Sequence, residues 1–143
     1  MFDQFDWRKI LERLTVIDQL EFILKNKKDR KPIGAAKLAS MVRKHRIKNN
    51  DNAFNRALGN ATRRGRCPVR CNAYVGNNGE FLVIIEDSGQ GFDYEALIKK
   101  FNSGQKYFQG HGKGMRVYNA NRYSRVSCSG NGNTIAILYN MKA

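Results

Sequence analysis

The spacing of apolar residues changes along the chain, and each change marks a new element. From Trp7 to Leu24 large apolar residues recur at steps of three and four, with charged residues between them. This spacing is typical of an amphipathic helix. Its apolar face is expected to complete the core, with a dimer interface as the alternative. The region 1–31 is therefore predicted to be an amphipathic helix followed by a basic loop, which Pro32 ends.

Two further helices are predicted upstream of the first strand. Residues 34–48 place Leu38, Met41 and Val42 on one face beside many basic residues, and His45 is expected on the solvent side. After a polar break, a third helix runs from Ala53 to Arg64. Gly65 follows it as a carboxyl-terminal cap.

The pattern then changes to short apolar runs, which predict two β-hairpins. Loops rich in glycine and asparagine, at 76–79 and 130–133, join the two strands of each hairpin. A short helix at 93–102, a polar loop at 103–111 and another helix lie between the hairpins. The predicted strands are Pro68–Val75, Phe81–Glu86, Tyr123–Ser129 and Thr134–Met141.

Composition indicates one globular domain that spans residues 1–143. The hydrophobic content of 41% with 10% aromatic residues is ordinary for a globular protein. No apolar run approaches the roughly 18 residues that a membrane span needs. The acidic amino terminus does not resemble a signal peptide. A cytoplasmic protein without membrane contact is expected.

The cysteines and the net charge narrow the function classes. Cys67 and Cys71 are separated by three residues instead of the two usual in zinc and redox motifs, and Cys128 is expected to be a reduced structural thiol.

The net charge is +14, and residues 1–75 hold 18 Lys and Arg against 7 Asp and Glu. This excess of basic residues in the first half of the chain favours an anionic partner: a nucleic acid, an acidic protein surface or a phosphorylated ligand.

The stretch Glu86-Asp87-Ser88-Gly89-Gln90-Gly91 holds the first candidate chemistry. The apolar run 81–85 predicts a central strand covered on both faces, which delivers Asp87 to the edge of the core. A carboxylate there accepts hydrogen bonds from an amino group. Gly89 and Gly91 let the backbone approach a ligand or adopt positive φ. An ordinary strand exit, with Asp as a turn former, is the alternative.

A second candidate is Gly110-His111-Gly112-Lys113-Gly114-Met115, which opens the predicted helix after the polar loop. Alternating glycines before a helix leave backbone N–H groups free to bind an anion, and the helix dipole favours negative charge there. At such a site Lys113 would add a charge and His111 a donor. A flexible loop before a helix explains the glycines equally well. Because no buried strand leads directly into this stretch, it fits neither the dinucleotide fingerprint nor a P-loop.

Taken together, these motifs resemble the GHKL superfamily of ATP-binding domains, which includes DNA gyrase, a heat-shock chaperone, histidine kinases and a mismatch-repair protein. The resemblance covers residues 52–141, with a lid at 93–109. It implies an α+β fold of the Bergerat type: a two-layer α/β sandwich whose mixed, mostly antiparallel sheet is covered on one face by helices. It also implies ATP and Mg²⁺ as ligands. In size the chain is similar to the stand-alone anti-sigma serine kinases, which bind a regulatory protein partner.

The resemblance assigns a role to each matching residue. Asp87 resembles the acceptor of the adenine amino group, with Gly89 and Gly91 in the turn beneath the base. Asn60 resembles the asparagine that ligates Mg²⁺, and its amide oxygen suits a hard cation. Arg63 matches a basic phosphate contact. The remaining matches are the phosphate-closing stretch Gly110, His111, Gly112, Lys113, Gly114 and Met115, and Thr134, which resembles the family's Gly-Thr strand start with Asn133 in place of the second glycine.

One departure concerns catalysis. Gyrase-like and anti-sigma members carry a glutamate four residues before the magnesium asparagine, and that position is Arg56 here. Arginine is not a general base. Asn55 is a poor substitute, and Glu86 lies on another element. ATP binding with weak phosphoryl transfer is therefore expected, and no catalytic residue is assigned.

The alternative function is a nucleic-acid-binding protein. Residues 33–65 also read as a helix-turn-helix with late arginines, and the hairpin that follows would be a wing. The charge favours this hypothesis, whereas both glycine motifs remain unexplained by it.

Overall fold

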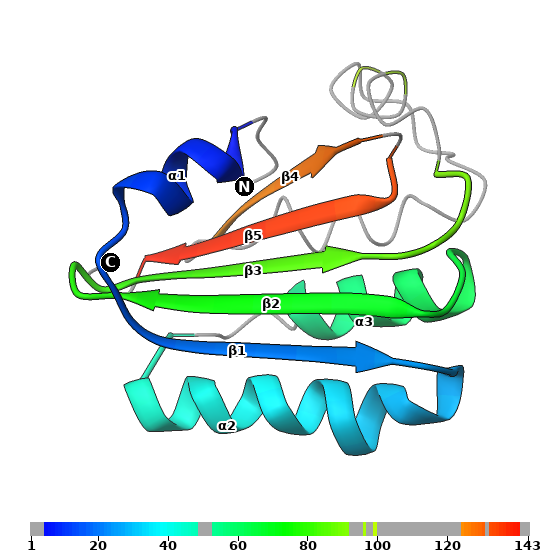
Figure 1. Cartoon of the computed structure of the whole chain (residues 1–143), viewed down its shortest axis with the longest axis horizontal. Helices are drawn as coiled ribbons and strands as arrows, with labels where there is room; N and C mark the ends of the chain where they lie inside the picture. The colour runs from blue at the N-terminus through cyan, green and yellow to red at the C-terminus, as the bar shows by residue number, and fades with distance from the viewer. Residues whose placement is uncertain are drawn as a thin grey trace.

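The computed structural model of the chain describes residues 5–48, 53–91, 96, 99, 124–130 and 132–140. Its strands form one five-stranded sheet in the order β1-β2-β3-β5-β4 (Figure 1), and each neighbouring pair is antiparallel. The sheet that these residues form is thus antiparallel throughout, where the resemblance implied a mixed one. The strands are β1 Val16–Leu24, β2 Val69–Gly76, β3 Glu80–Glu86, β4 Ser124–Ser129 and β5 Thr134–Asn140.

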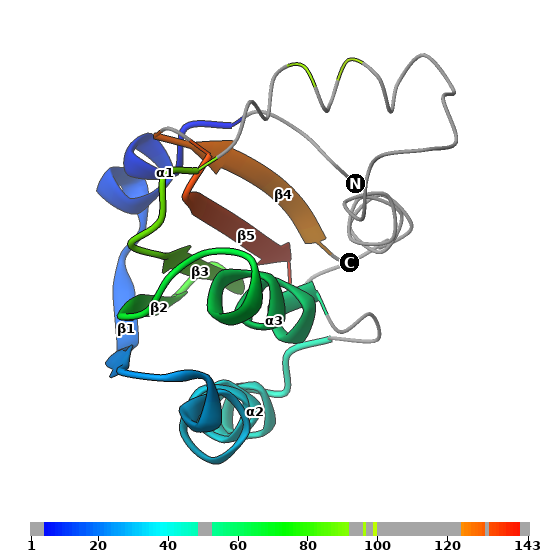
Figure 2. The same ribbon diagram turned by 90° about the vertical axis from the view of Figure 1, so that its right-hand side faces the viewer.

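Helices lie on both faces of the sheet. Figure 2 shows the sheet nearly edge-on, with α2 and α3 on one side and α1 on the other. The α+β class is therefore confirmed, and α1 adds a cover on the face that was expected to lack helices. The helical segments are α1 Trp7–Arg13, η1 Lys27–Asp29, η2 Arg30–Ala35, α2 Ala36–His45 and α3 Ala53–Arg63.

Strand β3 lies at the centre of the sheet, between β2 and β5. Phe81, Val83 and Ile85 pack into the core beneath α2 and α3, and Leu82 and Ile84 pack into a second cluster with Ile10 and Leu14 on the α1 side. Because both faces are covered, the strand is apolar at successive positions instead of alternating. The predicted hairpins and the buried central strand are confirmed.

The predicted helix from Trp7 to Leu24 is wrong beyond Arg13. The chain leaves α1 at Leu14 and forms β1, which pairs with β2 in register from Asp18↔Val75 to Leu24↔Val69. Residues 20, 22 and 24 fit a two-residue period as well as a helical one, and the free edge of β2 selects the strand. Pairing with β2 and packing against α2 override the local helical pattern.

Residues 27–31 of the basic run 25–31 are helical, which corrects the predicted loop. The side chain of Asn26 accepts a hydrogen bond from the Lys28 N–H at 3.0 Å, and Asp29 Oδ2 accepts from the backbone N–H groups of Lys25 and Asn26 at 3.1 and 3.3 Å. These bonds cap a helical path that continues through η1 and η2 into α2. Pro32 is the third residue of η2, within its first turn, where an N–H group has no acceptor inside the same helical segment.

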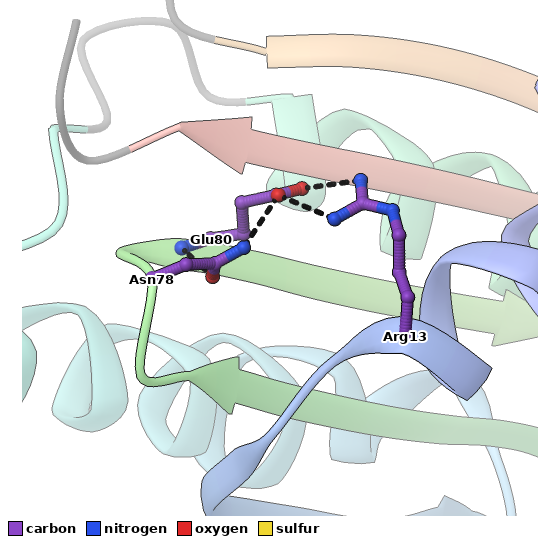
Figure 3. A network of polar contacts seen from close by, with 3 residues as sticks. All are labelled: Arg13, Asn78 and Glu80. Atoms are coloured by element: carbon purple, nitrogen blue, oxygen red, sulfur yellow. Dashed lines mark hydrogen bonds and ion pairs between the residues drawn. The ribbon is translucent and has the colours of Figure 1, made fainter.

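A polar network fastens α1 to the sheet (Figure 3). The Arg13 guanidinium donates to both carboxylate oxygens of Glu80, at 2.9 and 3.2 Å, and Asn78 Nδ2 donates to Glu80 Oε1 at 2.7 Å. Bidentate pairing of this kind fixes orientation. The network therefore holds the end of α1 over the β2–β3 turn.

The β2–β3 hairpin is interior to the sheet, because β1 and β5 flank it. It does not project as the wing that the helix-turn-helix hypothesis expected. Among the described residues, no helix is long and apolar enough to cross a membrane.

Candidate functional site

The candidate site begins where β3 ends, and the backbone of Asp87 is held there from two sides. The Asp87 N–H donates to the Asn133 carbonyl at 2.9 Å, and Asn133 Nδ2 donates back to the Asp87 carbonyl at 3.3 Å. On the other side, the Ser88 N–H donates to the Arg66 carbonyl at 2.8 Å, and Ser88 Oγ donates to the Pro68 carbonyl at 2.7 Å. The position of Asp87 is thus fixed by the β4–β5 turn and by the chain after α3.

The Asp87 carboxylate is half-buried, and its hydrogen bonds come from the backbone. Its Oδ1 accepts from the Gly89 N–H at 2.7 Å. Burial raises the pKa of Asp87, and the backbone N–H groups of Gly89 and Arg66 oppose that rise. No ion pair joins this carboxylate to a Lys, Arg or His among the residues described. Its acceptor capacity is therefore only partly used within the protein.

Glycines give this carboxylate its space. A Cβ at Gly65 would collide with the Asp87 carboxylate and with the Ala61 carbonyl, so no side chain fits there without displacing one of them. A Cβ at Gly89 would lie 2.9 Å from Asp87 Oδ1. Gly91 has a φ of 78°, which strongly favours glycine. Of the two glycines, Gly91 has the positive φ that was expected after β3, and Gly89 brings its N–H to the Asp87 carboxylate.

Helix α3, whose end at Gly65 lies against Asp87, carries a row of polar side chains. Its apolar face packs against the sheet, while Arg56, Asn60 and Arg63 follow one another at helical spacing along one side. Arg63 folds back along the helix, because its Nε donates to the Gly59 carbonyl at 3.2 Å and its guanidinium occupies the space over Gly59. The row therefore presents two guanidinium groups and one amide.

Asn60 is linked to Asp87 through Gly65. The Asn60 carbonyl accepts from the N–H groups of Arg64 and Gly65 at 2.9 and 3.0 Å, which ends α3, and Gly65 lies against the Asp87 carboxylate. Gly65 follows the end of α3 as predicted, but it does not have the positive φ of a left-handed glycine cap. The end of α3 and the end of β3 thus meet at one glycine.

Thr134 starts β5 beside the same strand end. It pairs with Glu86 in the β3–β5 ladder, its side chain is buried, and its Oγ1 donates to Glu86 Oε2 at 3.3 Å. Since Asp87 follows Glu86 directly, Thr134 lies one residue along the ladder from Asp87, with its hydroxyl on Glu86. Asn60, Arg63, Asp87, Gly89, Gly91 and Thr134 are all described, and the contacts above join the ends of α3 and β3 to the start of β5.

The second half of the predicted site lies outside the described residues. This part comprises Gly110, His111, Gly112, Lys113, Gly114 and Met115, together with the lid at 93–109 except Ala96 and Lys99, which are helical and exposed. The described half contains the Asp87 carboxylate, the Asn60 amide and the Arg63 guanidinium.

Sequence reasoning missed several residues that build the described half. In the sequence Asn133 is a departure from the family's glycine, whereas in the structure it bonds the Asp87 backbone twice. Arg66 was counted only as charge, yet its carbonyl anchors Ser88. For Asn133, the available signal in the sequence was that an asparagine lies directly beside a motif.

The cysteines take no part in this site. None of the three forms a disulfide, and burial raises the pKa of Cys71 and raises that of Cys128 to about 12. Both thiols stay protonated at neutral pH, which agrees with the structural role expected for Cys128.

Comparison of the chain with protein-family models, with curated proteins and with solved structures found no match.

Proposed function

We propose that this chain is an ATP-binding regulatory protein of the GHKL type, with Asp87 as the residue that recognises adenine. The observation that carries the proposal is the half-buried Asp87 carboxylate, fixed by backbone hydrogen bonds at the end of a central strand and paired with no cation among the described residues. If Asp87 were only a turn former at the end of β3, its carboxylate would not need the space that Gly65 leaves for it.

The geometry of Asp87 suits an amino group better than a metal ion or a phosphate. A phosphate would be repelled by the carboxylate, and in the described residues no group of three or more His, Cys, Asp or Glu that could hold a metal surrounds it. The exocyclic amino group of adenine donates a hydrogen bond to such an acceptor. A site built around that donor rejects bases with a carbonyl in its place, since the carboxylate would then face a second acceptor.

The phosphate side of the proposal rests on α3. Asn60 offers an amide oxygen to Mg²⁺, and Arg63 offers a guanidinium to a phosphate, from the helix that ends against Asp87. In the proposed fold, a Bergerat-type two-layer sandwich, the covering helix α1 is an addition to the open face of the sheet. Arg56 occupies the position of the activating glutamate, so we propose nucleotide binding with slow phosphoryl transfer. A cytoplasmic protein partner, as in anti-sigma kinases, completes the proposal.

The proposal is tested by titrating the protein with a fluorescent ATP analogue in the presence of Mg²⁺. We expect micromolar binding, and we expect Asp87→Asn to lower the affinity at least about 100-fold. The reason is that the substituted side-chain amide would present either an N–H donor or a weaker acceptor oxygen to the adenine amino group. Asp18→Asn is the matched control, since it makes the same chemical change on the edge strand β1. A fluorescent inosine nucleotide should bind weakly to the unsubstituted protein.

An equal affinity of the two variants for the ATP analogue would refute adenine recognition by Asp87. Thermal unfolding gives an independent readout, because ligand at 100 times its dissociation constant stabilises the folded state by about 2.7 kcal/mol. No shift of the melting temperature by ATP with Mg²⁺ would contradict the proposal as a whole.

A second test concerns Arg56. A carboxylate introduced by Arg56→Glu, one helical turn before Asn60, restores a general base, and we expect ATP hydrolysis to rise at least tenfold, within the roughly 10²- to 10⁴-fold range of general-base catalysis. Arg64→Glu, which changes the charge equally just after α3, is the control and should leave hydrolysis unchanged. Fast turnover in the unsubstituted protein would contradict the role given to Arg56.

A further inference from the structure

The strongest charge asymmetry of the molecule lies outside the candidate nucleotide site. Residues 25–48 hold ten Lys and Arg against one acidic residue, Asp29, so that this sixth of the chain carries about two thirds of the net charge of +14. Asp29 is engaged in the cap of η1, where it accepts two backbone N–H groups. The segment therefore has little internal charge compensation.

The fold gathers these charges on one layer. Residues Lys27–His45 form an uninterrupted helical path through η1, η2 and α2, which lies along β1 on the α2 and α3 side of the sheet (Figures 1 and 2). The apolar side of the path faces the core, with Leu38 fully buried and Met41 nearly so. The exposed cations along it are Lys27, Lys28, Lys31, Lys37, Arg43 and Lys44.

Among the described residues, neighbouring elements balance part of this charge. Asp18 on β1 pairs with Lys44 Nζ at 3.0 Å and with His45 Nε2 at 2.7 Å. Lys37 lies 6.0 Å from the ring centroid of Phe22. No ion pair of Lys27, Lys28 or Lys31 is found among the described residues. We call the exposed side of residues 25–48 the basic layer.

The chemistry of the basic layer distinguishes among anionic partners. Residues 25–48 contain no Phe, Tyr or Trp, so the layer lacks the aromatic anchors typical of protein interfaces and of single-stranded nucleic-acid sites. Its large apolar residues face the core, so it has no apolar face to insert into a lipid surface. What remains is a row of long cationic side chains on a rigid helical path.

We propose that the basic layer binds the phosphate backbone of double-stranded nucleic acid without reading its sequence. Nineteen helical residues extend about 28 Å at 1.5 Å per residue, which matches about eight phosphates along one strand. Lysine and arginine side chains reach phosphate oxygens by charge-assisted hydrogen bonds. This binding is independent of the nucleotide site, which is built at the ends of α3 and β3.

The experiment measures binding of the full chain to a fluorescent 20-base-pair duplex of mixed sequence, by anisotropy, across a series of salt concentrations. If about five cations contact phosphates, the slope of log Kobs against log salt is about −4.5. Duplexes of different sequence should bind equally. Polyglutamate and vesicles that contain phosphatidylserine serve as competing polyanions and should bind more weakly than the duplex at each salt concentration.

Two double substitutions test whether the basic layer is responsible. Lys27→Gln with Lys28→Gln removes two charges from the layer and leaves the backbone cap of η1 in place. We expect binding to weaken at least about tenfold and the slope to fall by about 1.8. Arg8→Gln with Lys9→Gln removes two exposed charges from α1 on the opposite face and should change affinity less than twofold.

An equal loss in both double variants would overturn the proposal, because binding would then follow net charge alone. So would tighter binding of polyglutamate or vesicles than of the duplex. Asp87→Asn should leave duplex affinity unchanged while ATP binding is lost, which separates a failure of this inference from a failure of the nucleotide proposal.

Discussion

Two aspartates of this fold, Asp18 on the edge strand β1 and Asp87 at the end of the central strand β3, show opposite use of the same functional group. Asp18 accepts hydrogen bonds from Lys44 and His45, and these neighbours, His45 first, lower its pKa to about 2. Asp87 is bonded only by backbone N–H groups among the described residues, and burial raises its pKa.

The difference separates a structural carboxylate from a recognition carboxylate. The charge of Asp18 is balanced within the fold, where it ties β1 to the end of α2. The charge of Asp87 is partly desolvated without a cation, which costs free energy that packing elsewhere must offset. Groups held at such a cost mark functional sites more often than structural ones. We therefore expect substitutions around the two residues to differ in kind as well as in size.

The largest effect on stability is expected from Gly65→Ala. The new Cβ would collide with the Asp87 carboxylate and with the Ala61 carbonyl. Because one neighbour is backbone, the site cannot relax cheaply, and we expect a loss of about 2–3 kcal/mol in the free energy of unfolding. Chemical denaturation measures the loss. Affinity for the ATP analogue should fall as well, since the carboxylate is displaced.

Gly59→Ala is the matched control for that substitution. Its Cβ would lie 3.0 Å from the Arg63 guanidinium, which is the movable end of a long side chain. Alanine is favoured over glycine inside a helix by about 1 kcal/mol, so stability should stay equal or rise. If both alanine variants lost the same stability, the close fit between Gly65 and Asp87 would not be the cause.

The central part of the fold could be predicted from the sequence because local and tertiary signals agree there. The apolar run of β3, the glycine and asparagine loops of both hairpins, and the helical spacing of α3 each have one interpretation. The segment 14–24 does not, since its apolar positions satisfy two periods. Only the unpaired edge of β2, which no local pattern reveals, selects the strand.

The motifs of the candidate site could be predicted from the sequence, whereas the residues that hold Asp87 in place could not. Asp87, Gly89 and Asn60 stand in recognisable patterns, whereas Asn133 and Gly65 reach Asp87 from segments 46 and 22 residues away in sequence. His45 shows the same limit: it was expected on the solvent side, yet its side chain is only 15% exposed and bonds Asp18. Contacts across the fold decide these positions.

Asp18→Asn should have a smaller effect on stability than Gly65→Ala and a defined pH dependence. The folded pKa of Asp18, about 2, lies below the ordinary value near 3.9. Its contribution is therefore present above pH 4 and is lost as the pH falls through 2. Because the carboxylate is partly exposed, we expect a loss of about 1 kcal/mol at pH 7. Denaturation at pH 7 and at pH 2 should show the difference shrinking.

Asp87→Asn should have the smallest effect on stability and the opposite sign. The pKa of Asp87 is raised in the folded state, so the folded protein loses stability as the pH rises from the unfolded pKa to the folded pKa, and the full penalty remains above the folded pKa. The amide keeps an oxygen for the Gly89 N–H and removes the desolvated charge. We expect the variant to gain about 0.5 kcal/mol at pH 7, and the gain to disappear in acid. Denaturation at the two pH values checks this, and a loss comparable to that of Asp18→Asn would assign Asp87 a structural role instead.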